Sequence, residues 1–104
     1  MQTQAEMNQT AAREYTKADA ELTRVYKQLM AQLTKTKSDK RADLLRDSER
    51  AWLKFRDTQA LFDASEMQGG SAYPLLHFGS LARTTKARTA ELKLILQSEK
   101  GQRG

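Results

Sequence analysis

Histidine and cysteine, the residue types that most often carry catalysis or bind metals, are almost absent from this chain. His77 is the only histidine, and there is no cysteine. A histidine can act as a general base or as a metal ligand. However, a single histidine beside Phe78 on a predicted helix, with no second histidine or cysteine nearby, is more typical of a structural or surface residue. We therefore predict no catalytic residue, no metal site and no cofactor, and we expect that the protein is not an enzyme.

Two carboxylates and one arginine are the other residues that could do chemistry. Glu21 and Asp57 could supply the acid and base of a glycosidase, so a small hydrolase is one alternative. A nearby arginine opposes it, because a guanidinium lowers the pKa of a neighbouring carboxyl group and a general acid needs a raised pKa. Arg88 is expected on the inner face of its helix, where it needs a carboxylate partner. We predict that Glu21, Asp57 and Arg88 form a structural polar core with Trp52, the only tryptophan.

A glycine-rich segment separates the last two predicted helices. Gly69, Gly70 and Ser71 could cradle a phosphate before a helix N-terminus, but no strand precedes them and the lysine of a P-loop is missing. A plain turn between two helices is favoured. Because binding residues concentrate on loops that a rigid scaffold holds, this turn together with Tyr73 and Pro74 is our candidate partner-binding surface.

Three segments have the hydrophobic spacing of amphipathic helices: residues 5–34, 40–67 and 73–99. In the first, apolar residues follow alternating steps of four and three, as in a coiled coil. These residues are Ala11, Tyr15, Ala18, Leu22, Val25 and Leu29. The corresponding inner positions of the third segment are Phe78, Leu81, Thr85, Arg88, Leu92 and Ile95.

The second segment carries most of the large aromatic residues. Trp52, Phe55 and Phe62, with Leu45, are expected on one helix face. Polar residues interrupt this stripe, so polar groups are expected to enter the space between the helices. We predict that the three aromatic side chains pack in the core.

The breaks between the segments determine the topology. Ser38 or Asp39 is expected to cap the second helix, the paired glycines supply the positive φ that ends a helix, and Pro74 suits the first turn of the third. Two short connections make neighbouring helices antiparallel. The predicted fold is all-α, an antiparallel three-helix up-down-up bundle with long helices over residues 1–99, followed by a disordered tail over residues 100–104.

The composition excludes several classes of protein. The chain has 104 residues, of which 38% are hydrophobic, which suits one well-solvated domain. No apolar run approaches the roughly 18–20 residues needed to span a bilayer. The N-terminus lacks the basic and apolar regions of a signal peptide, so the protein is expected to be periplasmic or secreted if such a peptide was removed and cytoplasmic otherwise.

The net charge of +5 raises nucleic acid, an anionic membrane and an acidic protein as partners. Positive charge dominates the C-terminal third. However, its lysines and arginines are spread around the helix, and no helix-turn-helix pair is evident. We predict no nucleic-acid partner, and we keep a cytosolic basic protein that associates with nucleic acid as an alternative.

Short motifs along the whole chain resemble those of one family. The N-terminal part has Gln4-x-Glu6-Met7-Asn8, Tyr15-x-x-Ala18-Asp19-x-Glu21-Leu22 and Tyr26-x-x-Leu29. The centre has Arg50-Ala51-Trp52 and Phe55-Arg56-Asp57, and the last part has Gly69-Gly70-Ser71-x-x-Pro74, Leu81-Ala82 and Thr85-x-x-Arg88-x-x-Glu91-Leu92. In their order and spacing over residues 4–92, these motifs resemble the lysozyme inhibitor LprI-like family.

The resemblance implies a small helical bacterial protein, usually exported, whose best-known function is to bind and inhibit lysozyme. Members usually carry cysteines where this chain has Thr10, Ala60 and Ser80, so packing alone must hold this bundle together. Animal lysozymes are strongly basic, so a chain of charge +5 is repelled rather than steered toward them. We predict a non-enzymatic binding protein of the cell envelope whose partner is a protein, such as a lysozyme or another cell-wall hydrolase. The sequence does not predict the oligomeric state.

Overall fold

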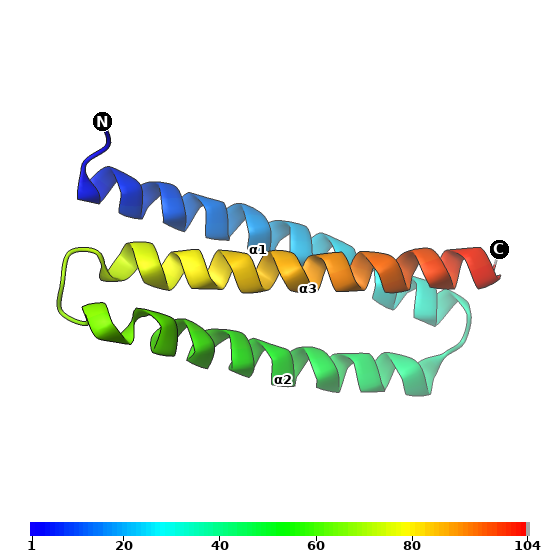
Figure 1. The fold of residues 1–104 in the computed structure, drawn as a ribbon. Helices are drawn as coiled ribbons and strands as arrows, with labels where there is room; N and C mark the ends of the chain where they lie inside the picture. The colour runs from blue at the N-terminus through cyan, green and yellow to red at the C-terminus, as the bar shows by residue number, and fades with distance from the viewer. Residues whose placement is uncertain (104) are drawn as a thin grey trace.

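The computed structural model describes residues 1–103. It contains the helices α1 (Gln4–Lys35), α2 (Asp39–Ala64) and α3 (Tyr73–Arg103), and a 3₁₀ turn η1 (Ser65–Met67). Consecutive helices run in opposite directions, and all regular elements of the described residues are helical (Figure 1). The predicted all-α up-down-up bundle of three long helices is confirmed.

The N-terminus of α1 is closed by a capping box. The Thr3 hydroxyl accepts a hydrogen bond from the backbone N–H of Glu6 at 3.1 Å, and the Glu6 carboxylate accepts one from the N–H of Thr3 at 3.0 Å. These bonds satisfy donors that the first helical turn leaves free. The N–H of Thr3, by donating to the carboxylate, also lowers the pKa of Glu6 from its usual value, because this bond favours the charged form.

The connection between α1 and α2 turns without a glycine. Lys37 adopts a left-handed backbone conformation with φ of 57°, which residues other than glycine rarely adopt. Ser38 precedes α2 as the sequence indicated, but its side chain makes no capping hydrogen bond. Its hydroxyl lies 3.1 Å from the hydroxyl of Thr36, so the two side chains stabilise the turn together.

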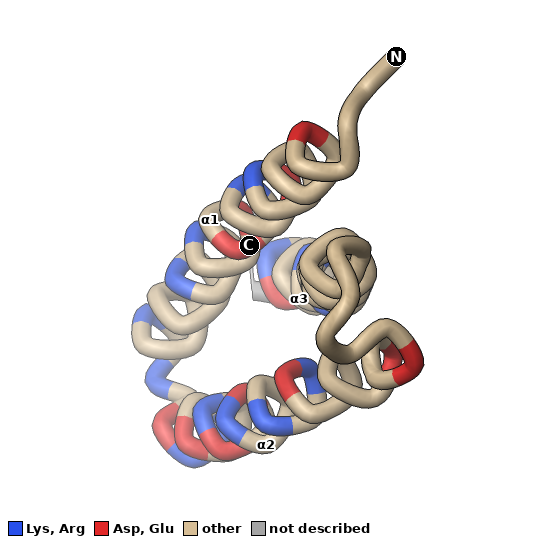
Figure 2. Tube along the Cα trace, turned by 90° about the vertical axis from the view of Figure 1, so that its left-hand side faces the viewer, with Lys and Arg blue, Asp and Glu red and all other residues tan. Residues whose placement is uncertain are grey.

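The helices form an elongated and rather flat arrangement of 50 × 26 × 14 Å. α3 packs mainly on α1 and less on α2, and α1 and α2 contact each other least. Figure 2 shows α1 and α2 meeting at their short connection and diverging toward the other end, where α3 lies between them. None of the helices in residues 1–103 is both long and apolar enough to cross a membrane.

The apolar core lies where all three helices meet. Its buried members are Leu22, Val25, Leu29 and Leu33 of α1, Ala42 of α2, and Leu92 and Leu96 of α3. Trp52 is partly buried and packs against this cluster. The regular spacing predicted for α1 is therefore the spacing that the core uses.

The predicted core face of α2 is wrong for two of its three aromatic residues. Phe55 is 53% exposed and Phe62 is 72% exposed. The buried positions of α2 are instead Ala42, Glu49, Arg56, Ala60 and Ala64. These positions lie to one side of Trp52 and hold three alanines and two charged residues that pair with α1 and α3, so the two phenylalanines turn outward.

The C-terminal helix continues beyond the expected boundary at Glu99. α3 extends to Arg103, because Gly101 keeps a helical backbone instead of the left-handed conformation that ends many helices. A disordered tail was expected over residues 100–104, and its last residue lies outside the described part of the chain.

Candidate functional site

The middle of the bundle contains an arginine of α2 that contacts two aromatic rings. The Arg56 guanidinium carbon lies 5.4 Å from the ring centres of both Tyr15 and Trp52, within the range of cation–π attraction. Arg56 also donates to Asp57 at 2.9 Å and to Asp19 of α1 at 3.2 Å. Burial is the largest single influence and would lower the pKa of Arg56, but Asp57, Tyr15 and Asp19 together outweigh it and the pKa is raised. Arg56 therefore links α2 to α1 as a permanent cation.

A second arginine lies on the other side of the same tryptophan. The Arg88 guanidinium of α3 is 5.8 Å from the Trp52 ring centre. Its Nε donates to Glu49 of α2 at 2.9 Å, and its Nη2 donates to Ser48 at 3.3 Å. The side chains of Arg56 and Arg88 are only 8% and 12% exposed, so each brings a charge into the interior that must be paired.

The residues predicted for the polar core do not form one cluster. Arg88 pairs with Glu49, whereas the sequence suggested Asp57 or Glu21. Asp57 pairs with Arg56 next to it in the chain, and Glu21 lies at the surface. Trp52 is the residue that contacts both arginines.

Sequence reasoning missed Glu49 and Arg56 as interior residues. One signal could have found them, because residues 42, 49, 52, 56 and 60 have the same alternating spacing as the core of α1. The polar interior links helices to one another. In the described residues there is no group of three or more histidine, aspartate and glutamate side chains that could hold a metal ion.

The connection between α2 and α3 forms a compact tip at one end of the bundle. Gly69 has φ of 82°, which strongly favours glycine. At Gly70 a Cβ atom would lie 3.2 Å from the carbonyl oxygen of Met67, so this position also favours glycine. The side chain of Asn8 in α1 donates to the backbone oxygen of Ser71 at 2.9 Å. The tip, residues 65–74, is therefore fixed by its own glycine turn and by the hydrogen bond from α1, although residues 65–71 are exposed.

Stacked rings connect the tip to the bundle. Tyr73 stacks on His77 with ring centres 5.6 Å apart, and His77 contacts Phe78 edge-on at 5.5 Å. Phe78 in turn lies 6.1 Å from Tyr15, which contacts Arg56. His77 therefore has a packing role in this row, and Tyr73 and Pro74 are half-buried at its outer end.

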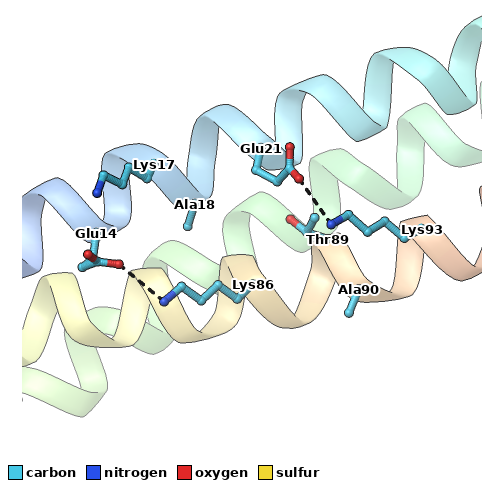
Figure 3. A pocket seen from close by; sticks show the side chains of 8 residues that line it. All are labelled: Glu14, Lys17, Ala18, Glu21, Lys86, Thr89, Ala90 and Lys93. Atoms are coloured by element: carbon cyan, nitrogen blue, oxygen red, sulfur yellow. Dashed lines mark ion pairs between the residues drawn. The ribbon is translucent and has the colours of Figure 1, made fainter.

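Two grooves run along α1. The first, of about 360 Å³, lies between α1 and α3 and is lined by Glu14, Lys17, Ala18, Glu21, Lys86, Thr89, Ala90 and Lys93. Figure 3 shows the paired charges across it: Lys86 lies 3.7 Å from Glu14, and Lys93 lies 3.2 Å from Glu21. The second, of about 390 Å³, lies between α1 and α2 around Tyr26 and Leu53. Both are open, shallow surfaces in which most charges already have partners.

The Glu21 carboxylate has a strongly lowered pKa. Arg24 donates to it at 2.6 and 2.9 Å, and Lys93 lies 3.2 Å away. These two cations, Arg24 first, lower the pKa of Glu21 from 4.5 to about 2. This direction is opposite to the one that a general acid needs.

The sequence of this chain is similar to those of known proteins. A family described as "Lysozyme inhibitor LprI" matches residues 1–92. An uncharacterized protein of Rhizobium meliloti (strain 1021) is 35% identical over 104 aligned residues, which cover 91% of this chain and 75% of that protein. No solved structure gives a significant match.

Proposed function

The chain belongs to the lysozyme inhibitor LprI family, and from this premise we propose that it is a non-enzymatic protein of the cell envelope that binds and inhibits a lysozyme or a related cell-wall hydrolase. The match spans α1, α2, the tip and most of α3. The interior supports a binding role, because its carboxylates are engaged in ion pairs between helices. The proposal assigns no reaction to the protein.

The observation that carries the proposal is the structure of the tip. Gly69 and Gly70 form a turn that other residues would strain, and Asn8 of α1 holds it through Ser71. A rigid, exposed loop on helices loses little conformational entropy when it binds. The tip therefore suits insertion into the cleft of an enzyme.

The charge of the tip supports the same surface. Within residues 65–74 the only charged residue is Glu66, although the whole chain carries a net charge of +5. The lysines and arginines lie along the helices and in the α1–α2 connection, whereas the connection from η1 to α3 has none (Figure 2). The tip is thus the part of the molecule that a basic enzyme repels least.

A pair of charge reversals tests this surface. Glu66→Lys changes the tip, and Asp47→Lys changes an exposed carboxylate of α2; both variants have the same net charge. We expect Glu66→Lys to weaken inhibition of peptidoglycan hydrolysis about tenfold, because it places like charges together at the contact, and Asp47→Lys to weaken it by less than about twofold. Equal effects of the two variants would show that the tip does not contact the enzyme.

Inhibition itself needs a panel of enzymes. Purified protein should be titrated into turnover assays of animal lysozymes and of bacterial cell-wall hydrolases. We expect a dose-dependent loss of turnover for at least one of them. Full activity of every enzyme at a large molar excess of the protein would contradict the proposed function.

The cell envelope is the compartment that this function requires, because lysozymes and other cell-wall hydrolases act there. Fractionation of cells that express the natural gene should place the protein in the periplasm or the medium. Recovery only in the cytoplasm would contradict this part of the proposal.

A further inference from the structure

The α2–α3 hairpin exposes six large apolar side chains. These side chains, between 39% and 72% exposed, are Leu44, Phe55 and Phe62 of α2 and Leu76, Leu94 and Ile95 of α3. On α2 they are separated by 11 and 7 residues, which are close to three and two helical turns. The three α2 residues therefore share one face of α2, and Leu76 and Leu94, five helical turns apart, share one face of α3. We call the surface formed by the six residues the apolar strip.

Contacts between the two helices fix their register along the strip. Arg41 forms an ion pair with Glu99 at one end, Ser48 accepts from Arg88 near the middle, and Ser80 donates to Asp63 toward the tip. This antiparallel register places Leu44 level with Ile95. Phe62 is level with the first turns of α3, so the strip runs along most of the hairpin, whose helices lie side by side in Figure 1.

α1 does not cover the apolar strip. It contacts the opposite flank of the hairpin, where Glu14 pairs with Lys86 and Glu21 with Lys93. At about 200 Å² for each fully exposed large side chain, the six residues present roughly 600 Å² of apolar surface. That area is at the upper limit for a monomer and approaches the roughly 800 Å² that each partner contributes to a standard interface.

The residues of the strip are arranged symmetrically along the helices. On α2, Leu44 and Phe62 are equally far from residue 53, and on α3, Leu76 and Leu94 are equally far from residue 85. In the register described above, residues 53 and 85 are level with each other. A surface with matching ends is what a two-fold contact between identical chains requires.

The exposed charges beside the strip have nearly the same centre. Arg83 and Glu91 are both exposed on α3, four residues on either side of the small, exposed Ala87. In a pair of antiparallel α3 helices centred between residues 85 and 87, each Arg83 would lie within one helical turn of Glu91 of the partner subunit. Their intramolecular contacts are long, 3.8 Å from Arg83 to Asp63 and 3.9 Å from Glu91 to Arg88, which leaves both side chains available.

We propose that the apolar strip is the interface through which two copies of this chain form an antiparallel two-fold dimer. The four helices α2 and α3 of the two copies then make a four-helix bundle. Leu44 packs near Phe62 of the partner subunit, and Leu76 packs near Leu94 of the partner subunit. The two tips point away from each other and stay free, so the dimer is independent of the proposed function and compatible with it.

The first test is the molecular mass in solution over a wide range of protein concentration. The 11.8 kDa chain should sediment at twice this mass at high concentration. Phe55→Glu should shift the protein to the monomer, whereas Leu61→Glu, an equally exposed position on another face of α2 (53% and 54%), should leave the dimer intact. Circular dichroism confirms that both variants are folded.

The second test uses the lack of cysteine in the chain. Ala87→Cys introduces a thiol at the centre of the proposed interface, and Ala90→Cys introduces one three residues away in the α1–α3 groove. Under mild oxidation we expect a disulfide-linked dimer of the Ala87→Cys variant and little of the Ala90→Cys variant. Arg83→Glu should weaken the dimer at least several-fold, and the double variant with Glu91→Arg should restore it.

Three results would overturn the proposal. They are a monomer at every concentration, a dimer that survives Phe55→Glu, and a dimer that Leu61→Glu dissociates equally. A monomer that binds lipid vesicles through the strip would also overturn it, because the occupant would then be a membrane surface. None of these results depends on whether the protein inhibits a lysozyme.

Discussion

The two outer helices of this bundle bury different kinds of surface. α1 buries six residues, all of them alanine, valine or leucine, whereas α2 buries three alanines together with Glu49 and Arg56. Two of the large aromatic side chains of α2 are correspondingly at the surface, with Phe55 53% and Phe62 72% exposed. The comparison shows that α1 is held by apolar burial, while α2 is held by close approach of small residues and by ion pairs around Trp52. Each prediction below tests one side of this difference.

The largest difference is expected between one buried and one exposed apolar residue. Leu29 of α1 is completely buried, whereas Phe62 of α2 is mostly exposed. Leu29→Ala should lower the free energy of unfolding by about 3–5 kcal/mol, because it leaves a cavity in the core. Phe62→Ala should change it by less than about 0.5 kcal/mol. Urea unfolding at a concentration where both proteins are monomeric measures the two values, and a large loss for Phe62→Ala would show that α2 does bury its aromatic face.

The ion pairs of α2 should have the next largest effect. Arg88→Ala leaves Glu49 without its partner in a site where both side chains are about 11–12% exposed. We expect a loss of about 2–3 kcal/mol, since removing one member of a buried pair leaves an uncompensated charge.

Glu91→Ala is the control for this variant. It removes the other, 66% exposed carboxylate near Arg88 and should cost less than about 0.5 kcal/mol. Thermal unfolding at neutral pH compares the two variants. If Arg88→Ala unfolds at the temperature of the wild type, the polar interior does not hold α2 in place.

These differences also explain which parts of the structure the sequence could predict. The bounds of the helices follow from spacing, glycine and proline, and the expected segment 5–34 is close to the observed Gln4–Lys35. The core face of α1 was predictable because its apolar residues follow one regular seam. The core face of α2 was not predictable. Trp52, Phe55 and Phe62 suggest one face, but the buried face consists of alanines and two charged residues.

The partners of charged residues were harder to predict than the helices. That Arg88 needs a carboxylate follows from its place in the seam, but its choice of Glu49 depends on the register between α2 and α3, which no pattern within one helix determines. The positions where the resemblance implies cysteines include Ala60 and Ser80, both completely buried. Ser80 donates to Asp63 at 2.7 Å, so a hydrogen bond joins α2 and α3 here. The role of the tip as a binding surface remains a prediction.

The two connections allow a further comparison of moderate size. Gly69 at the tip and Lys37 between α1 and α2 both have positive φ. Gly69→Ala should destabilise the chain by about 1 kcal/mol, because alanine is strained in the left-handed region. Lys37→Gly should stabilise the chain by up to about 1 kcal/mol, because it relieves the same strain at Lys37. The entropy that glycine loses on folding reduces this gain. Urea unfolding measures both, and effects of equal sign would mean that backbone strain does not govern the two turns.

The smallest expected effect is the acid sensitivity of the α1–α3 contact, which contrasts with the buried pair of α2. The pKa of Glu21 is lowered to about 2 from 4.5 by Arg24 and Lys93. Because the folded-state value is the lower one, the carboxylate stabilises the fold fully above about pH 4.5, and this contribution is lost as the pH falls toward 2. Glu21→Gln should therefore unfold at a slightly lower temperature than the wild type at pH 7, and at the same temperature near pH 2.

Salt separates this surface contact from the interior one. The Glu21 side chain is 38% exposed, so high salt should screen the pair and remove most of the difference between Glu21→Gln and the wild type. Arg88→Ala should remain destabilised in the same salt, because its pair with Glu49 is largely shielded from solvent. Glu66→Gln, at an exposed residue that has no ion pair in the described chain, is the control and should unfold like the wild type in both conditions. If the effect of Glu21→Gln persists in high salt, the α1–α3 contact depends on a charge that is shielded from solvent, as the contact of α2 with α3 does. The contrast between α1 and α2 would then be limited to their apolar residues.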